Sequence, residues 1–329
     1  MLKDTPDKSK RLMKLISAAD SIAIIGHVKP DGDCIGSILG LANYIIDNYQ
    51  NKTVDVFAEA FPASFKILNG ARKVKHDAPR KGYDLAISVD VSDTDRLGKF
   101  QDLYSRAITT ICIDHHVSNK GFGDFSYIDA DASSAAEVLC DLVDMDKVSE
   151  RTANCLYLGM VHDTGVFKYS STSRHTMELA GHLIELGADS QFIIDETFYK
   201  KTYKQNMLMA KTILESMLHF DGKVITGYIS KATFKQFKAT SMDTEGIVEQ
   251  LRLTDGVEVA VFVYQKTRNT YKFSLRSKTK VDVSVIASGL GGGGHKRAAG
   301  VDLTGNIDDL MGVILGKIKD QLDGKNEAE

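Results

Sequence analysis

Residues 21–33 have the sequence SIAIIGHVKPDGD. The first six residues are mostly apolar and β-branched, which is typical of a short buried strand. A polar loop follows, and apolar residues then recur at helical spacing from residue 35 to residue 46. A buried strand that leads directly into an amphipathic helix is the beginning of a parallel α/β arrangement. This stretch therefore predicts an α/β fold.

The same alternation continues through the first half of the chain. Ser134 and Glu137 have the spacing of a capping box, and Gly187 is a natural end for a helix. We therefore expect a mostly parallel sheet with helices on both faces. Further strands are expected at residues 54–58, 84–90 and 108–114, and further helices at residues 134–143, 151–161 and 173–186.

The pattern changes after residue 189, where the strands stop and a polar, helical stretch follows. A chain of 329 residues is also longer than a single core usually is. We expect a first α/β domain at 1–189, a helical connector at 190–220 and a smaller α/β domain at 221–329. In the last of these, strands are expected at residues 223–230, 257–265 and 271–277, and helices at residues 244–253, 281–290 and 306–322.

Composition limits the partners and the compartment. The formal net charge is −3, whereas a protein that coats long nucleic acid usually has a basic surplus, so any nucleic-acid substrate should be short. No apolar run is long enough to span a bilayer, and the N-terminus lacks the apolar core of a signal peptide. The four cysteines form no C-x-x-C pair. We expect a cytoplasmic protein without membrane association; the oligomeric state stays open, with a homodimer among the alternatives.

Acidic and imidazole side chains follow four of the apolar runs. Ligands of parallel sheets gather at the carboxyl ends of the strands, so these four clusters should converge on one site. An aspartate at a strand end is, by itself, more often a turn or cap residue; the four clusters together favour chemistry. The clusters are His27 with Asp31 and Asp33, then Asp90, then Asp114-His115-His116, and finally Asp163.

A site with five carboxylates requires a positive counter-charge. Two like charges ~4 Å apart repel by about 4 kcal/mol at an effective dielectric constant of ~20. Divalent cations remove this cost and keep the carboxylates ionised. Carboxylates and imidazoles without a thiolate favour manganese or magnesium over structural zinc, and the imidazoles favour manganese. Two such ions could bind a phosphate, generate a hydroxide and stabilise an in-line displacement.

The second half contributes a glycine run and two cationic candidates. Gly293 and Gly294 belong to a run of four glycines directly before His295, and such backbone can approach an oxyanion closely. A flexible hinge is the alternative. Arg276, in an expected strand, could clamp a phosphate; an outward-facing strand residue is the alternative for this position.

Together these motifs resemble those of the DHH phosphoesterase family, in the same order. Residues 291–300 resemble the GGGHxxAAG signature of the C-terminal domain associated with that family. The likeness is strongest to its compact bacterial nanoRNase A group, which degrades oligoribonucleotides of a few residues and removes the 3′-phosphate of pAp. Some close relatives act on cyclic-di-AMP or on pApA.

The resemblance implies roles for individual residues. His27 and Asp31 would hold one metal ion, Asp33 and His115 would hold the other, and Asp90 and Asp163 would serve both. Asp114 would orient His115, and His116 would face the scissile phosphate. Arg96 matches a position that recurs in the family, but the resemblance assigns it no role. The implied substrate contacts are Asn119, Arg276, Gly293, Gly294 and His295.

Three functions follow as alternatives. The leading one is a hydrolase of short oligoribonucleotides and pAp that uses two divalent ions, Mn²⁺ or else Mg²⁺. The second is a soluble phosphodiesterase for cyclic-di-AMP or pApA, and no single residue decides between these two. The third is a catalytically inactive nucleotide sensor, which is disfavoured because all six metal-ligand positions are filled.

Overall fold

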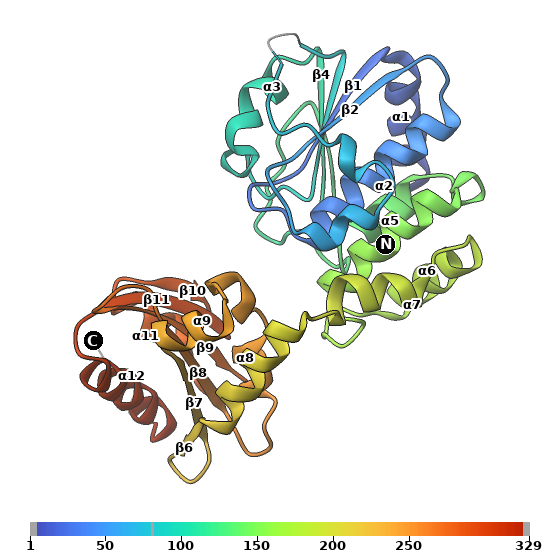
Figure 1. Cartoon of the computed structure of the whole chain (residues 1–329). Coiled ribbons are helices and arrows are strands. Elements are labelled where there is room, and N and C mark those ends of the chain that lie inside the picture. The colour runs from blue at the N-terminus through green and yellow to red at the C-terminus, as the bar shows by residue number, and fades with distance from the viewer. Residues whose placement is uncertain (1–4, 80–81, 325–329) are drawn as a thin grey trace. The chain divides into compact units, whose positions relative to one another are not determined.

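The computed structural model describes residues 5–79 and 82–324. The chain forms two compact units, one up to Lys200 and one from Lys201, and each has its own sheet (Figure 1). The division lies within the stretch expected to be a connector. Helix α7 (Ser190–Ile194) and a π-helical turn (Asp195–Tyr199) precede it, and helix α8 (Tyr203–Leu214) follows it. No helix among the described residues is long and apolar enough to cross a membrane.

The first unit is built on a five-stranded, fully parallel sheet with the strand order β2-β1-β3-β4-β5. Because β1 pairs with β2 on one side and β3 on the other, the order of connection reverses between β1 and β3. Ligand sites in such sheets lie at this switch point. The strands are β1 (Ser21–Ile25), β2 (Thr53–Phe57), β3 (Leu85–Val89), β4 (Thr109–Asp114) and β5 (Phe125–Ile128).

Helices cover both faces of this sheet, which confirms the expected fold class. Ile22 and Ile24 of β1 face the larger core, together with helices α1, α2, α4 and α5. Ala23 and Ile25 face a smaller core under α3 and a 3₁₀ segment, η3 (Figure 1). The bounds are α1 (Thr5–Ala18), α2 (Gly32–Asn48), η3 (Thr94–Phe100), α3 (Gln101–Ser105), α4 (Ala135–Leu142), α5 (Glu150–Asp163) and α6 (Arg174–Glu185).

Helices α2 and α5 pack closely because glycines line their contact. A Cβ atom added at Gly36 would lie 2.5 Å from the carbonyl oxygen of Cys155 on α5. A Cβ atom added at Gly159 on α5 would lie 2.7 Å from the Asp33 carboxylate on α2. The absence of side chains at these positions thus lets α2 approach α5.

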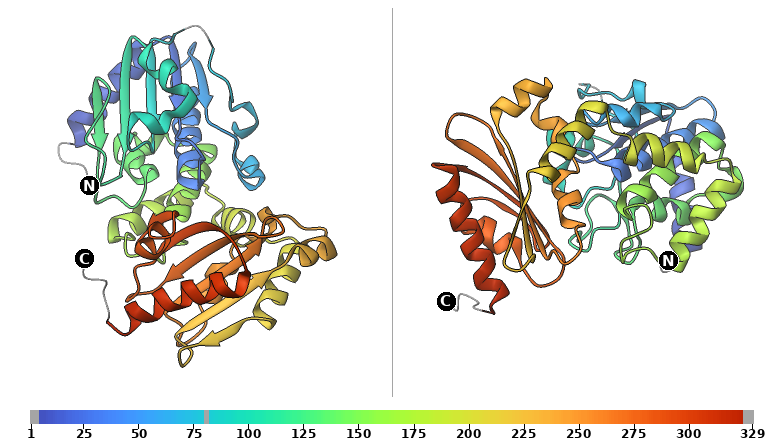
Figure 2. Two further views of the ribbon diagram at one scale, coloured as in Figure 1. Left: turned by 90° about the vertical axis from the view of Figure 1, so that its left-hand side faces the viewer. Right: turned by 60° about the horizontal axis from the view of Figure 1, so that its bottom comes forward.

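The second unit has a six-stranded mixed sheet with the order β10-β11-β9-β8-β7-β6, in which only β7 and β8 run parallel. Helices α11 and α12 pack on one face, and α8 and α10 pack on the other (Figure 2). The elements are β6 (Met217–His219), β7 (Val224–Ile229), α9 (Lys231–Phe237), α10 (Ile247–Arg252), β8 (Val259–Gln265), β9 (Thr270–Ser277), α11 (Val283–Ser288), β10 (Gly293–His295), β11 (Ala298–Thr304) and α12 (Ile307–Leu322).

Several elements were not expected from the sequence. Strand β6 has only three residues and lies in the stretch where we expected no strand. The glycine run is partly the edge strand β10, and β11 has the sequence AAGVDLT, which contains few strongly β-forming residues. β11 forms a strand because it pairs with β9 along its whole length, and β10 in turn pairs with β11. Tertiary pairing therefore decides these elements.

A substitution at Gly36 tests the contact between α2 and α5. We expect Gly36→Ala to lower the free energy of unfolding by about 1–3 kcal/mol, because the new methyl group would meet the backbone of α5. The matched control is Gly181→Ala on α6, where an added Cβ meets nothing within 4 Å. The control should gain roughly 0.5–1 kcal/mol from reduced backbone freedom. Equal stability of the two variants in urea unfolding would contradict the proposed role of Gly36.

Candidate metal centre

Four segments bring the expected ligands together in the first unit. His27 follows β1, Asp31 caps the N-terminus of α2, and Asp33 lies in the first turn of that helix. Asp90 directly follows β3, and His115 directly follows β4. Asp163 is the last residue of α5. Its apolar run, residues 156–161, is the buried body of α5, where the sequence predicted a helix at residues 151–161.

Asp90 lies between two imidazoles. Its Oδ2 atom is 3.3 Å from Nε2 of His27, and its Oδ1 atom is 3.6 Å from Nε2 of His115. Nε2 of His115 is also 3.2 Å from Oδ2 of Asp163 and 3.9 Å from Oδ2 of Asp33. The structure therefore gathers side chains that are widely separated in the sequence around one carboxylate.

His27 also links this group to the sixth expected ligand. Its Nε2 atom is 3.7 Å from Oδ1 of Asp31. The side chain of Asp31 accepts a hydrogen bond from the backbone N–H of Cys34, so it is held at the start of α2. All six residues expected to bind metal thus lie at one end of the parallel sheet.

The backbone around Asp90 and Asp33 fixes these two carboxylates. Asp90 is 2% exposed, has a φ of 61°, and donates its backbone N–H to the carbonyl of Ile113. Aspartate tolerates this left-handed conformation better than most residues. Asp33 accepts hydrogen bonds from the backbone N–H groups of Ala135 and Ala136, at 2.6 and 3.1 Å. Asp33 therefore ties α2 to the N-terminus of α4, where the helix dipole favours an anion.

One oxygen in this group fits a cation. Oδ1 of Asp90 is buried and, within the described part of the chain, has no hydrogen-bond partner. A buried polar atom without a partner is costly, and a bound cation would remove that cost. The surrounding donors are carboxylate oxygens and imidazole nitrogens, the set that suits manganese, magnesium and related divalent ions. The residues present therefore fit a divalent metal centre.

Cys34 lies beside these ligands, and the sequence analysis missed it. Ligand atoms of His27, Cys34 and Asp90 lie within 4.8 Å of one another. Burial raises the pKa of the Cys34 thiol to about 11, which opposes formation of the thiolate that binds metals. Its position directly after Asp33 was the only sequence signal.

The carboxylates share protons with the imidazoles when no cation balances their charge. Burial alone would lower the pKa of His115, but the nearby carboxylate of Asp90 and the charges of Asp33 and Asp163 raise it to about 10. Burial opposes protonation of His27 as well, yet contacts with Asp31 and Asp90 raise its pKa. Burial and repulsion from neighbouring carboxylates raise the pKa of Asp163 to about 6, and they raise that of Asp33 too.

Asp114, His116 and Asn119 form a chain of hydrogen bonds beside the six ligands. Oδ1 of Asp114 accepts from Nδ1 of His116 at 2.8 Å, and Oδ2 accepts from the Asn119 amide at 2.7 Å. We expected Asp114 to orient His115, but Nδ1 of His115 instead lies 3.3 Å from the carbonyl of Ala132. The side chain of Asp114 is fully buried, and these two hydrogen bonds hold its pKa below the usual range even though burial opposes ionisation.

Asn119 was expected to contact the substrate, and the structure gives it another place. It is 8% exposed, and its amide also donates to the carbonyl of Val91 at 3.0 Å. Its Oδ1 atom accepts from the backbone N–H of Gly121. Because both ends of the amide are engaged within the protein, Asn119 supports Asp114.

The expected phosphate contacts of the second unit lie on neighbouring strands. Ala298 of β11 pairs with His295 of β10 on one side and with Arg276 of β9 on the other. Gly294 has a φ of 146°, and an added Cβ would lie 2.5 Å from the carbonyl oxygen of Ala298. Glycine is therefore required at this position. Gly293 and His295 are exposed on the same hairpin.

Metal binding should release protons. Coordinated imidazoles are neutral, whereas His115 keeps its proton up to about pH 10 in the metal-free protein. The apparent affinity for Mn²⁺ should therefore rise between about pH 6 and pH 8, by up to roughly tenfold per pH unit for each proton released. Calorimetric titrations in two buffers of different ionisation enthalpy measure this release. Equal heats in both buffers would show that the ligands are already deprotonated.

Comparisons with known proteins agree with this geometry. Residues 21–160 match the model of the DHH family N-terminal domain, and residues 221–321 match the DHHA1 domain. The chain is 31% identical to the probable bifunctional oligoribonuclease and PAP phosphatase NrnA of Streptococcus mutans, over 89% of this chain and 93% of that protein. It is 27% identical to the cyclic-di-AMP phosphodiesterase PdeA of Listeria monocytogenes, over 90% of this chain and 46% of that protein.

A solved structure extends the likeness to the whole chain. The crystal structure of an exopolyphosphatase-related protein from Bacteroides fragilis superposes with a TM-score of 0.85 and 25% identity, and 98% of each chain is covered. Together with the two domain matches and the Streptococcus relative, this similarity identifies the chain as a member of the DHH family of phosphoesterases with a DHHA1 domain.

Proposed function

We propose that this chain is a metal-dependent phosphoesterase that hydrolyses short oligoribonucleotides and removes the 3′-phosphate of pAp. The observation that carries the proposal is the group of carboxylates and imidazoles around Asp90, whose buried Oδ1 atom lacks a hydrogen-bond partner in the described chain. The Streptococcus relative, named for these two activities, is similar over nearly its whole length. The proposed function is therefore the one in that relative's name.

We assign the six ligands to two divalent ions, with Mn²⁺ favoured over Mg²⁺. His27 and Asp31 would hold one ion, Asp33 and His115 the other, and Asp90 and Asp163 would serve both. When bound, the ions activate a water molecule and stabilise negative charge on the phosphate. The mixed oxygen and nitrogen donor set supports this assignment.

His116 is the proposed proton donor to the leaving oxygen. Its side chain is 37% exposed, and Asp114 accepts a hydrogen bond from its Nδ1 atom. This hydrogen bond raises the pKa of His116, so the imidazolium is favoured and the other ring nitrogen, Nε2, can carry the proton to be donated. Asn119 holds Asp114 from the opposite side. These three residues would orient and charge a general acid.

We propose that residues 221–329 select the substrate, that residues 1–189 perform the chemistry, and that residues 190–220 connect them. Arg276 and His295 would bind the phosphate at the non-reacting end of the substrate, assisted by the backbone of Gly293 and Gly294. Their neighbouring positions on β9, β11 and β10 support a shared task. Binding energy from the remote end of a substrate orients the bond that reacts.

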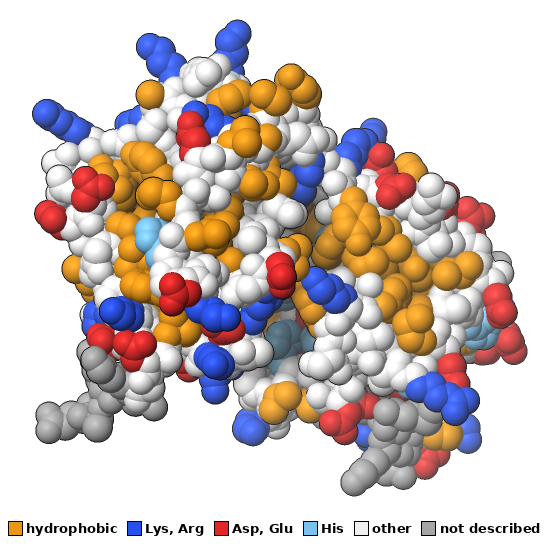
Figure 3. All heavy atoms as spheres, turned by 90° about the horizontal axis from the view of Figure 1, so that it is seen from below, with side chains coloured by type: hydrophobic (Ala, Val, Ile, Leu, Met, Phe, Trp, Pro, Cys, Tyr) orange, Lys and Arg blue, Asp and Glu red, His pale blue; other side chains and the backbone are white. Residues whose placement is uncertain are grey.

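Charge distribution supports short substrates over long nucleic acid. The formal net charge is −3. On the face in Figure 3, Lys and Arg side chains are interspersed with Asp and Glu, and they form no continuous basic stripe. A protein that binds long strands usually presents such a stripe. The substrate should therefore be held locally.

The second candidate is a phosphodiesterase for cyclic-di-AMP or pApA. The Listeria relative favours it by name, but this chain corresponds to only 46% of that protein. The inactive sensor is disfavoured because all six ligands are present and lie together.

We also propose a cytoplasmic location, because all four cysteines are buried and unpaired, as is usual in reducing compartments. For a homodimer, exposed apolar residues offer a contact surface: Met217 and Leu218 of the edge strand β6, with Leu214 at the end of α8. Sedimentation equilibrium tests whether two copies associate.

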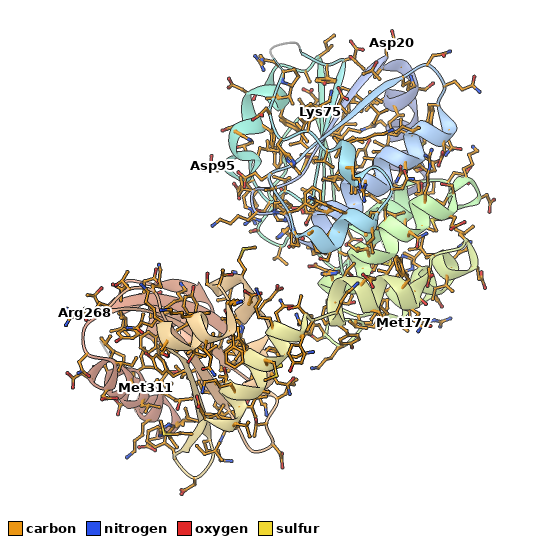
Figure 4. All side chains as sticks on the ribbon, in the orientation of Figure 1. Asp20, Lys75, Asp95, Met177, Arg268 and Met311 are labelled. Atoms are coloured by element: carbon orange, nitrogen blue, oxygen red, sulfur yellow. The ribbon has the colours of Figure 1, made fainter. Side chains whose placement is uncertain are left out.

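The first test is a hydrolysis panel combined with a substitution at Asp90. With Mn²⁺, the protein should hydrolyse pAp and di- to pentaribonucleotides faster than cyclic-di-AMP, pApA, pyrophosphate or a long strand, and excess EDTA should abolish turnover. Asp90→Asn should lower kcat by at least about 100-fold, because it removes charge between the two sites while keeping the shape. The matched control, Asp20→Asn, changes an exposed aspartate directly before β1 (Figure 4). Near-normal turnover of the Asp90 variant would sink the metal-centre assignment.

The second test separates chemistry from substrate grip. His295→Ala should lower kcat/KM on pAp and dinucleotides by about 10- to 100-fold. On bis-p-nitrophenyl phosphate, which has no second phosphate to hold, the loss should stay below about threefold. The manganese content of the variant is measured alongside the assays on both kinds of substrate. Equal fractional losses on the two kinds of substrate would assign His295 to the chemical step or to the fold.

A further inference from the structure

Arg96 lies next to the metal centre and is not used by the mechanism above. It belongs to η3, the 3₁₀ segment Thr94–Phe100, and its Nη2 atom is 3.0 Å from Nδ1 of His27. Its Nε atom is buried and has no hydrogen-bond partner in the described part of the chain. An arginine has five N–H donors and no acceptor, so this side chain retains unused donors.

The contact with His27 supplies an acceptor in only one tautomer of the ring. Nδ1 of His27 is 2.8 Å from the carbonyl oxygen of Val28, which can only accept, as well as 3.0 Å from Nη2 of Arg96. In the tautomer that leaves Nε2 free for a metal ion, Nδ1 donates to this carbonyl, and the guanidinium of Arg96 then meets another donor. The opposite nitrogen of the same ring faces Asp31 and Asp90. The guanidinium is thus one imidazole away from the carboxylates and makes no ion pair with any residue that the structure describes.

The backbone holds Arg96 in this place. Its N–H donates to Oδ1 of Asp93, and its carbonyl accepts from the N–H of Val28 at 2.8 Å. Gly98, with a φ of 54°, turns the chain so closely against Val28 that an added Cβ would lie 2.4 Å from its side chain. The neighbouring Asp95 is exposed on the surface (Figure 4). Local backbone contacts, and not a carboxylate partner, therefore place the guanidinium beside the ligands.

We propose that Arg96 binds a phosphoryl group of the substrate. This inference rests on the proposed function and adds a substrate contact from the first unit. A phosphate supplies the anionic acceptors that the guanidinium lacks, and its oxygens match the planar N–H fork of arginine in a bidentate manner. A rotation of the long side chain away from His27 would replace a donor–donor contact with charge-assisted hydrogen bonds. Arg96 would thus bind the substrate at the end that reacts, beside the metal centre.

The test uses the manganese-loaded protein and inorganic phosphate as the probe. Arg96→Met should weaken phosphate binding, measured by calorimetry, by about 10- to 100-fold, because hydrogen bonds to charged groups are lost. kcat/KM on pAp should fall by a similar factor, and the manganese content should not change. The matched control is Lys99→Met, which removes a cation from the same 3₁₀ segment, where Lys99 pairs with the exposed Asp77 at 3.2 Å. The control should bind phosphate as the wild type does.

Three outcomes separate the alternatives. Unchanged phosphate affinity in Arg96→Met overturns the proposal. Loss of manganese from that variant also overturns it, because Arg96 would then act by positioning His27. If Arg96→Met fails to fold, Arg96→Lys decides: it keeps the charge but not the fork, and phosphate affinity should fall by roughly threefold or more.

The proposed function can fail separately. If the wild type hydrolyses neither pAp nor oligoribonucleotides, the phosphate-binding measurement still decides the role of Arg96, because it requires no turnover.

Discussion

Repulsion between buried carboxylates is the constraint on which the first unit depends. Asp33, Asp90 and Asp114 are all buried, and Asp31 and Asp163 lie beside them. Such a group is tolerable only with compensation, and the fold provides it in several forms. The N-terminus of α4 binds Asp33, an imidazole and an amide bind Asp114, and two imidazoles flank Asp90. Oδ1 of Asp90 is left without a hydrogen-bond partner in the described part of the chain. The protein does not balance the charge of this oxygen, so a cation is needed there.

Much of the fold could be predicted because its central strands are continuous apolar runs. Residues 21–26 and 84–90 lie in the middle of a parallel sheet that is covered on both faces, so their sequences carry a strong signal. Strands at the edges carry a weaker one. Strand β6 is only three residues long, and β11 is stabilised as a strand by its pairing with β9. A single sequence does not contain the partner that makes such a segment extended.

The candidate site was also predictable only in part. The sequence predicted which residues gather there, because charged groups that follow apolar runs converge at the strand ends. The hydrogen bonds between them could not. The side chain of Asp114 accepts a hydrogen bond from the ring of His116, whereas the ring of His115 contacts the carbonyl of Ala132. Asn119 is turned inward by the carbonyl of Val91, and neither direction is encoded in residue spacing. Cys34 became a neighbour of the ligands only through the turn into α2.

The hydrogen bonds from Ala135 and Ala136 to Asp33 also bear on how the protein assembles during synthesis. The strand that precedes His27 leaves the ribosome early, but the nearby carboxylate of Asp33 lacks its partners until α4 is made, and the last acidic residue, Asp163, comes later still. Contacts between such distant segments form slowly, since a long loop must close first. A nascent chain that has not reached α5 therefore offers only part of the cation-binding group. Capture of the ion is thus expected to come late, as a final step that stabilises a complete first unit and leaves truncated chains without that stabilisation.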